Sequence, residues 1–162
     1  MKKLLSIVAV AAVFSTGAIA DTITINGEVL AGAQVSFGAA PIGTLVGGTF
    51  AFEDAVVGFE NLALDQDNVD NQDVFVKTNS NNGVSISLDS TPDLSDGNGH
   101  TVPTTYALGG VNFVTGTAQS LTGGTNDGSV AIANQFTTTA HPAADQVSGS
   151  YQATIIATIA QN

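Results

Sequence analysis

The chain has 162 residues and no cysteine, and its 14 acidic and three basic residues give a formal charge of −11 at pH 7. This balance excludes ordinary nucleic-acid binding and docking on anionic lipid, because both require lysine and arginine. The length fits a single domain, and without disulfides its stability depends on an apolar core.

The first twenty residues predict a secretory signal peptide. Lys2 and Lys3 precede the apolar run LLSIVAVAAVF, and the small-residue sequence AIA ends at Ala20. The run is too short to cross a bilayer, which takes about 20 apolar residues. Cleavage after Ala20 leaves Lys77 as the one basic residue, with a charge of 1 − 14 = −13, and no membrane insertion is expected.

A long alternating segment follows directly. From Ile23 to Phe37 every odd position is apolar or glycine, and most even positions are polar. A period of two predicts a β-strand with one buried face. The segment is much longer than the usual strand of about 5–6 residues. Its place at the start of the mature chain is also unusual, because most domains leave their ends loose.

The rest of the chain continues with β patterns. Further strands are predicted over residues 48–52, 56–64, 74–78, 83–88, 102–110 and 130–140. Turn sequences such as Asn-Gly and Asp-Gly separate them. No window has the apolar stripe of a long amphipathic helix. The pattern therefore predicts an all-β sandwich in one domain.

The last predicted strand mirrors the first, because it also has one apolar face. It runs from about residue 151 almost to the terminal Asn162. The residues on its apolar face are Tyr151, Ala153, Ile155, Ala157 and Ile159.

Few residues suggest catalysis or metal binding. Asp65, Asp67 and Asp70 resemble part of a calcium loop, but the glycine and distal glutamate of helix–loop–helix sites are missing, so a solvated polar loop is the simpler interpretation. His100 and His141 have no ligands at metal spacing, and no Gly-x-Ser-x-Gly sequence marks a nucleophile. The sequence therefore predicts a protein that is not an enzyme and has no cofactor.

Taken in order, the strands resemble those of a known family. Four stretches carry the likeness: ITINGEVLAGAQV, SISLDSTPDLSDG, VPTTYALGG and VSGSYQATIIATIAQN. Together they resemble the major pilins of the alternate chaperone–usher pathway, the family of the class 5 fimbriae that includes colonisation factor antigen I. The likeness runs along most of the mature chain.

The resemblance implies an immunoglobulin-like sandwich that lacks its final strand and is completed by donor-strand exchange with a neighbouring subunit. Residues 21–32 would be the N-terminal donor-strand extension, and residues 33–162 the pilin domain. The side chains that fill the neighbour's groove, here called plugs, would be Ile23, Ile25, Gly27, Val29 and Ala31.

The resemblance also implies partners and a location. The protein would be the major structural subunit of a pilus shaft that polymerises head-to-tail, with a tip adhesin as a further partner, and would support bacterial adhesion. It would be exported through the periplasm to the cell surface. A periplasmic chaperone would hold the C-terminal strand and the carboxylate of Asn162, and an outer-membrane usher would exchange the strands.

Two other functions stay open from the sequence. One is a self-contained secreted β-sandwich that binds carbohydrate or calcium. The other is a subunit of a biofilm matrix fibre, which would share strand exchange but not the chaperone.

Overall fold

The structure is a computed structural model that describes residues 28–41, 44–52, 59, 61–121 and 126–162. The fold is all-β, as predicted, and none of the described residues forms a helix, so none belongs to a helix that could cross a membrane. The strands are β1 (Ala33–Phe37), β2 (Phe50–Phe52), β3 (Asn68–Thr78), β4 (Val84–Leu88), β5 (Leu94–Ser95), β6 (Thr101–Val102), β7 (Thr104–Leu108), β8 (Val111–Asn112), β9 (Gln119–Leu121), β10 (Val130–Ala140) and β11 (Ala157–Gln161).

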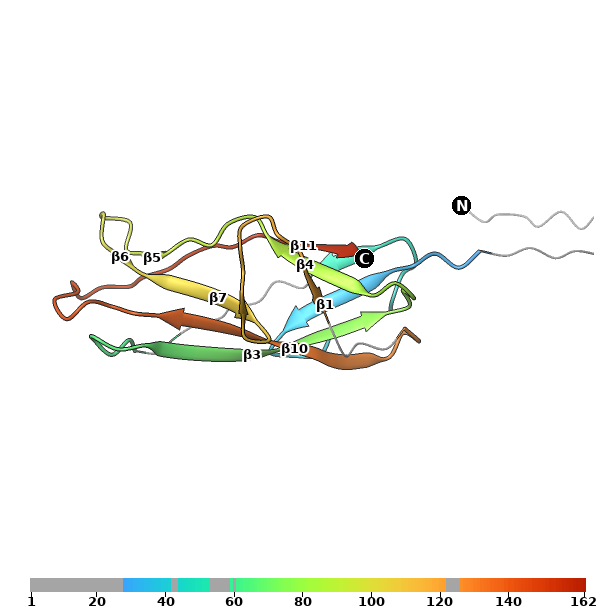
Figure 1. Ribbon diagram of the computed structural model, residues 1–162, viewed down its shortest axis with the longest axis horizontal. Coiled ribbons are helices and arrows are strands. Elements are labelled where there is room, and N and C mark those ends of the chain that lie inside the picture. Colours follow the sequence, from blue (N-terminus) through green and yellow to red (C-terminus); the bar gives the residue numbers. More distant parts are fainter. Residues whose placement is uncertain (1–27, 42–43, 53–58, 60, 122–125) are drawn as a thin grey trace, which may run out of the picture.

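Two main sheets form the body of the molecule (Figure 1). The larger has the strand order β2-β1-β3-β10-β7-β8, and the smaller has the order β11-β4-β9. All neighbouring strands are antiparallel except β1 and β2. Figure 1 shows β4 and β11 lying over β3 and β10, which is the layered arrangement of an immunoglobulin-like sandwich.

The core lies between these two layers. Its residues alternate along each strand, because successive side chains of a strand point to opposite faces. Val74 and Val76 of β3, for example, are buried, whereas Asp73, which lies on the opposite face of the same strand, is exposed. Full burial of such a side chain contributes about 1.5–3 kcal/mol of transfer free energy. The largest fully buried side chains are Val35, Val74, Val76, Val84, Ile86, Leu88, Val102 and Pro142.

The polar stretch before Val74 is a strand, and the prediction of a solvated loop there was wrong for most of its length. β3 begins at Asn68 and pairs with β10 from Asn68↔Ala140 onward. Main-chain pairing with β10 holds this part of β3, although its inward side chains are polar and only half-buried. These inward residues are Asn68, Asp70 and Gln72.

Three other predicted strands differ in extent. Of the opening alternation, residues 23–27 lie outside the described residues, and the described part forms a strand from Ala33, as β1. Pro103 divides the segment 102–110 into β6 and β7, because proline has no N–H to donate to the ladder. Of the segment 56–64, residues 56–58 and 60 lie outside the described residues, and residues 61–64 form no strand.

The N-terminal extension leaves the fold beside the turn that joins β3 to β4. The carbonyl of Leu30 accepts a hydrogen bond from the side-chain amide of Asn79, and Gly32 contacts Thr78 and Asn79. At the other end of the turn, the main chain of Asn162 donates to Gly83. The extension and the C-terminus therefore lie at the same end of the molecule (Figure 1).

Candidate functional site

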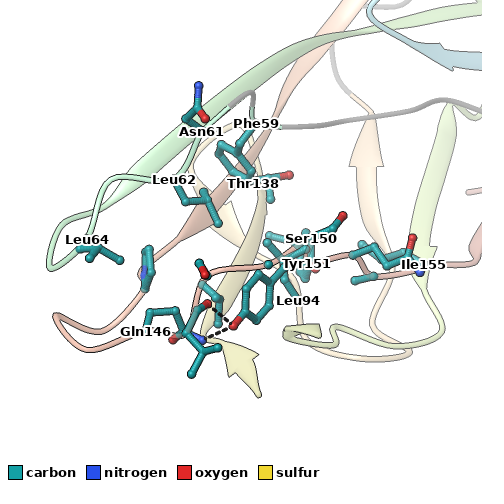
Figure 2. A pocket seen from close by; sticks show the side chains of 18 of the residues that line it. Phe59, Asn61, Leu62, Leu64, Leu94, Thr138, Gln146, Ser150, Tyr151 and Ile155 are labelled. Atoms are coloured by element: carbon teal, nitrogen blue, oxygen red, sulfur yellow. Dashed lines mark hydrogen bonds between the residues drawn. The ribbon is translucent and has the colours of Figure 1, made fainter. Parts of the chain in front are cut away.

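A groove of about 880 Å³ opens between the two sheets, in the half of the molecule away from the chain ends (Figure 2). Its floor is formed by the larger sheet. The Phe136 ring of β10 stacks on Phe37 of β1 with ring centroids 4.7 Å apart, and it lies 6.2 Å from the ring of Tyr106. These aromatic rings give the groove an apolar floor.

The floor is held in place by one polar contact at Tyr106. The Tyr106 hydroxyl donates a 2.7 Å hydrogen bond to the carbonyl of Pro92. Burial raises the pKa of this hydroxyl, and the carboxylate of Asp93 raises it further. The hydroxyl therefore stays protonated, and its hydrogen bond anchors the ring beside Phe136.

One flank of the groove is the segment that precedes β3. Phe59, Leu62 and Leu64 line it, together with Asn61. Figure 2 shows Phe59 and Leu62 beside Thr138 of the floor. The sequence marked this apolar segment as a strand but gave no sign that it borders a groove.

The other flank is the C-terminal segment, residues 146–157. The alternation predicted from Tyr151 is present in the structure, because from there to Ala160 the odd positions are half-buried and the even positions are exposed. The predicted residues that line the groove are Tyr151, Ala153, Ile155 and Ala157. Ile159 packs against the core instead, and Asn162 lies at the chain end beside the β3–β4 turn.

Among the described residues, one main-chain edge of this flank has no paired strand. Asp89 donates to the carbonyl of Ile156, and Asn162 donates to Gly83, so even-numbered residues face β4. Because neighbouring residues alternate, Ile155 and Ala157 direct their N–H and C=O groups to the opposite edge. β11 is the outermost strand of its sheet, so no described strand pairs with that edge. Such an edge is a template for an added strand.

No charged residue is among the described residues that line the groove. This is unusual in a chain with 14 carboxylates. Burying an unpaired charge is costly, so a groove of this kind suits an uncharged, largely apolar occupant. The polar groups at one end of the groove bind each other. The side-chain amide of Gln146 donates a 2.8 Å hydrogen bond to the Tyr151 hydroxyl, which in turn donates a 2.7 Å hydrogen bond to the carbonyl of Val147.

The two ends of the groove differ. Its outer end, near Leu64 and Pro142, lies where β3 begins and β10 ends, far from the β3–β4 turn. At its inner end β2 comes close to β11, and Phe50 and Ile159 both pack against the core there. Among the described residues, the lining on the C-terminal side stops at Ala157.

The structure does not bring the three calcium candidates together. Asp67 forms a 2.7 Å pair with His141, and Asp70 accepts hydrogen bonds from Gln72 within β3. No group of three or more metal-binding side chains occurs in the described part of the chain. His100 is not among the residues that line the groove; it lies in the β5–β6 hairpin, 2.7 Å from Asp96.

The plugs fall partly outside the described residues: Ile23, Ile25 and Gly27 do, as does the predicted signal peptide. Val29 is 87% exposed. Ala31 is half-buried, and its carbonyl accepts a 2.7 Å hydrogen bond from the main chain of Gly48.

Comparison with known proteins adds no identification. A search with protein-family models and a search of curated proteins each found no match to this chain.

Proposed function

We propose that this protein is the major structural subunit of a fimbrial shaft, and that its N-terminal extension fills the groove of the next subunit. The observation that carries the proposal is the open groove, with no charged residue in its described lining, beside the edge of β11 that no described strand covers. A strand added there would pair with that edge and cover the aromatic floor. This is β-augmentation used for polymerisation.

The extension has the composition that the groove requires. Residues 22–27, TITING, carry no charge and lie between Asp21 and Glu28. Ile23, Ile25 and Val29 alternate with polar residues, so an inserted strand would direct its apolar side toward the floor. Each fully buried plug would contribute about 1.5–3 kcal/mol, in addition to the main-chain hydrogen bonds.

The geometry favours an open filament over a closed ring. The extension leaves the molecule beside Asn79, whereas the groove opens near Leu64 and Pro142 at the opposite end. An extension at one end and an acceptor at the other make a heterologous, head-to-tail contact. Repetition of that contact gives a filament along the long axis of the subunit.

An unfilled groove explains why helper proteins are part of this proposal. The free edge of β11 and the exposed floor would aggregate in a crowded periplasm. A chaperone that lends a strand and an usher that exchanges it would protect the subunit until assembly. The proposal therefore includes export through the periplasm and display at the cell surface as an adhesive fimbria.

The test is assembly of a variant that lacks residues 21–30. We expect the wild-type chain, expressed together with a chaperone and usher of this kind, to form filaments visible by electron microscopy. The deletion variant should form none but should remain a soluble chaperone complex, because its own groove is intact. Gly27→Phe should behave in the same way, and Thr24→Ser, on the opposite face, should assemble normally. Filaments of normal length from the deletion variant would contradict the proposal.

A further inference from the structure

The groove offers a limited number of inward positions. In the part of its C-terminal flank where burial alternates, these are Tyr151, Ala153, Ile155 and Ala157, after which β2 approaches β11; the residues from Val147 to Ser150 also line the groove but are exposed. Four inward positions of a strand span about 20 Å from the first to the last. The free edge available to an inserted strand is therefore limited at its inner end.

The extension supplies the same number of plugs. Ala31 is tied to its own subunit through the Gly48 hydrogen bond, so it stays behind when the extension enters a neighbour. The other predicted plugs are Ile23, Ile25, Gly27 and Val29. These four plugs match the four inward positions of the groove.

The position of the donor's body sets the direction of insertion. That body lies beyond the outer end of the acceptor's groove, so Val29, nearest the body, lies at that end. With Val29 opposite Tyr151, antiparallel pairing places Ile23 opposite Ala157. Asp21, two residues before Ile23, then reaches the level of Ile159, where Phe50 of β2 packs against the core.

We propose that the contact between β2 and β11 is a stop that limits the groove to a segment beginning at or very near Asp21. This inference rests on the proposed function. β2 is held in place by its pairing with β1, so additional residues at the start of an inserted strand would not displace it easily. The groove would thus admit only extensions from which the signal peptide has been removed.

The stop has an asymmetric consequence. A chain with additional residues before Asp21 would be unable to donate its extension, but its own groove would be unchanged. Such a chain would still accept a wild-type extension. It would therefore end a filament instead of joining its interior.

The experiment mixes wild-type chains with a mature variant that carries Gly-Ser-Gly-Ser before Asp21. Val114→Cys labels either chain with gold at a 65% exposed side chain, and the label is unique because the protein has no cysteine. Labelled wild-type chains should appear along the whole filament in electron micrographs. Labelled extended chains should appear singly, at one end, and the mean filament length should fall in proportion to their share.

Each other outcome is decisive. Extended chains in the filament interior would overturn the stop, because the groove would then admit the additional residues. Complete absence of extended chains from filaments would also overturn it, because acceptance should be intact. Failure of wild-type chains to form filaments would instead contradict the proposed function.

Discussion

The two halves of the sandwich use the same sequence pattern with different results. Near the β3–β4 turn, Val76 of the larger sheet and Ile86 of the smaller sheet point into the core between the sheets, and both are at most 2% exposed. In the other half, Ile155 of the C-terminal segment has the same alternation but is only half-buried, because it borders the groove. The difference teaches that an apolar strand face must be covered by other residues, but the pattern does not show whether those residues come from the same chain.

Protease digestion should separate the two halves most strongly. Lys77 is the one trypsin site after the predicted signal peptide, and it lies in β3 between β1 and β10. Cleavage there requires unfolding, so it should be at least about a thousandfold slower than in the denatured chain. Ser148→Lys places a site on the exposed groove flank, where cleavage of the free subunit should be rapid. The measurement is gel electrophoresis over time, and rapid cutting at Lys77 would show that the closed half is not closed.

Truncation of a core side chain should have the next largest effect. Ile86 is fully buried in β4, so Ile86→Ala should lower the free energy of unfolding by about 2–5 kcal/mol. Ile156→Ala is a matched control, because Ile156 is 62% exposed, and it should change stability by less than about 0.5 kcal/mol. Denaturant unfolding of the chaperone-free subunit measures both. Equal effects of the two substitutions would contradict the assigned core.

Ile155 should respond to whether the groove is filled. In the free subunit Ile155→Ala should lower the free energy of unfolding by about 1 kcal/mol, which is less than the effect of Ile86→Ala. The reason is that the Ile155 side chain is already partly in contact with water. In the filament the cost should approach that of a core residue, since an inserted strand would cover it. Unfolding of subunits and of filaments in denaturant compares the two states. An unchanged cost on assembly would show that the groove is not the assembly site.

The smallest effect concerns the turn of the β5–β6 hairpin. The hydrogen bond from His100, followed by one from the main chain of Asn98, lowers the pKa of the Asp96 carboxyl from 3.8 to about 2. A lowered folded-state pKa contributes stability above pH 4 that is lost as the pH falls toward 2. Asp96→Asn should therefore flatten the decline in Tm between pH 4 and pH 2. An identical decline in both proteins would exclude this contribution.

Much of the fold follows from local pattern. The all-β class, β4 and β10, and the alternation of the C-terminal segment all came from a period of two between turn residues. The first half of β3 was missed because its inward residues, such as Asp70, are polar, and pairing with β10 is not visible in the sequence. The aromatic floor was missed for a similar reason, since Phe37 and Phe136 are far apart along the chain and meet only in the folded sheet.

By itself, the sequence determined that strands would form, where turns would separate them, and which face of the C-terminal segment would be apolar. Only the tertiary structure decided which apolar faces are covered and which remain open to a groove. The physical reason is that alternation is a property of neighbouring residues, whereas coverage depends on strand order and register between distant ones. The groove between Phe59, Asn61, Leu62 and Leu64 on one side and the C-terminal segment on the other is a result of that long-range pairing.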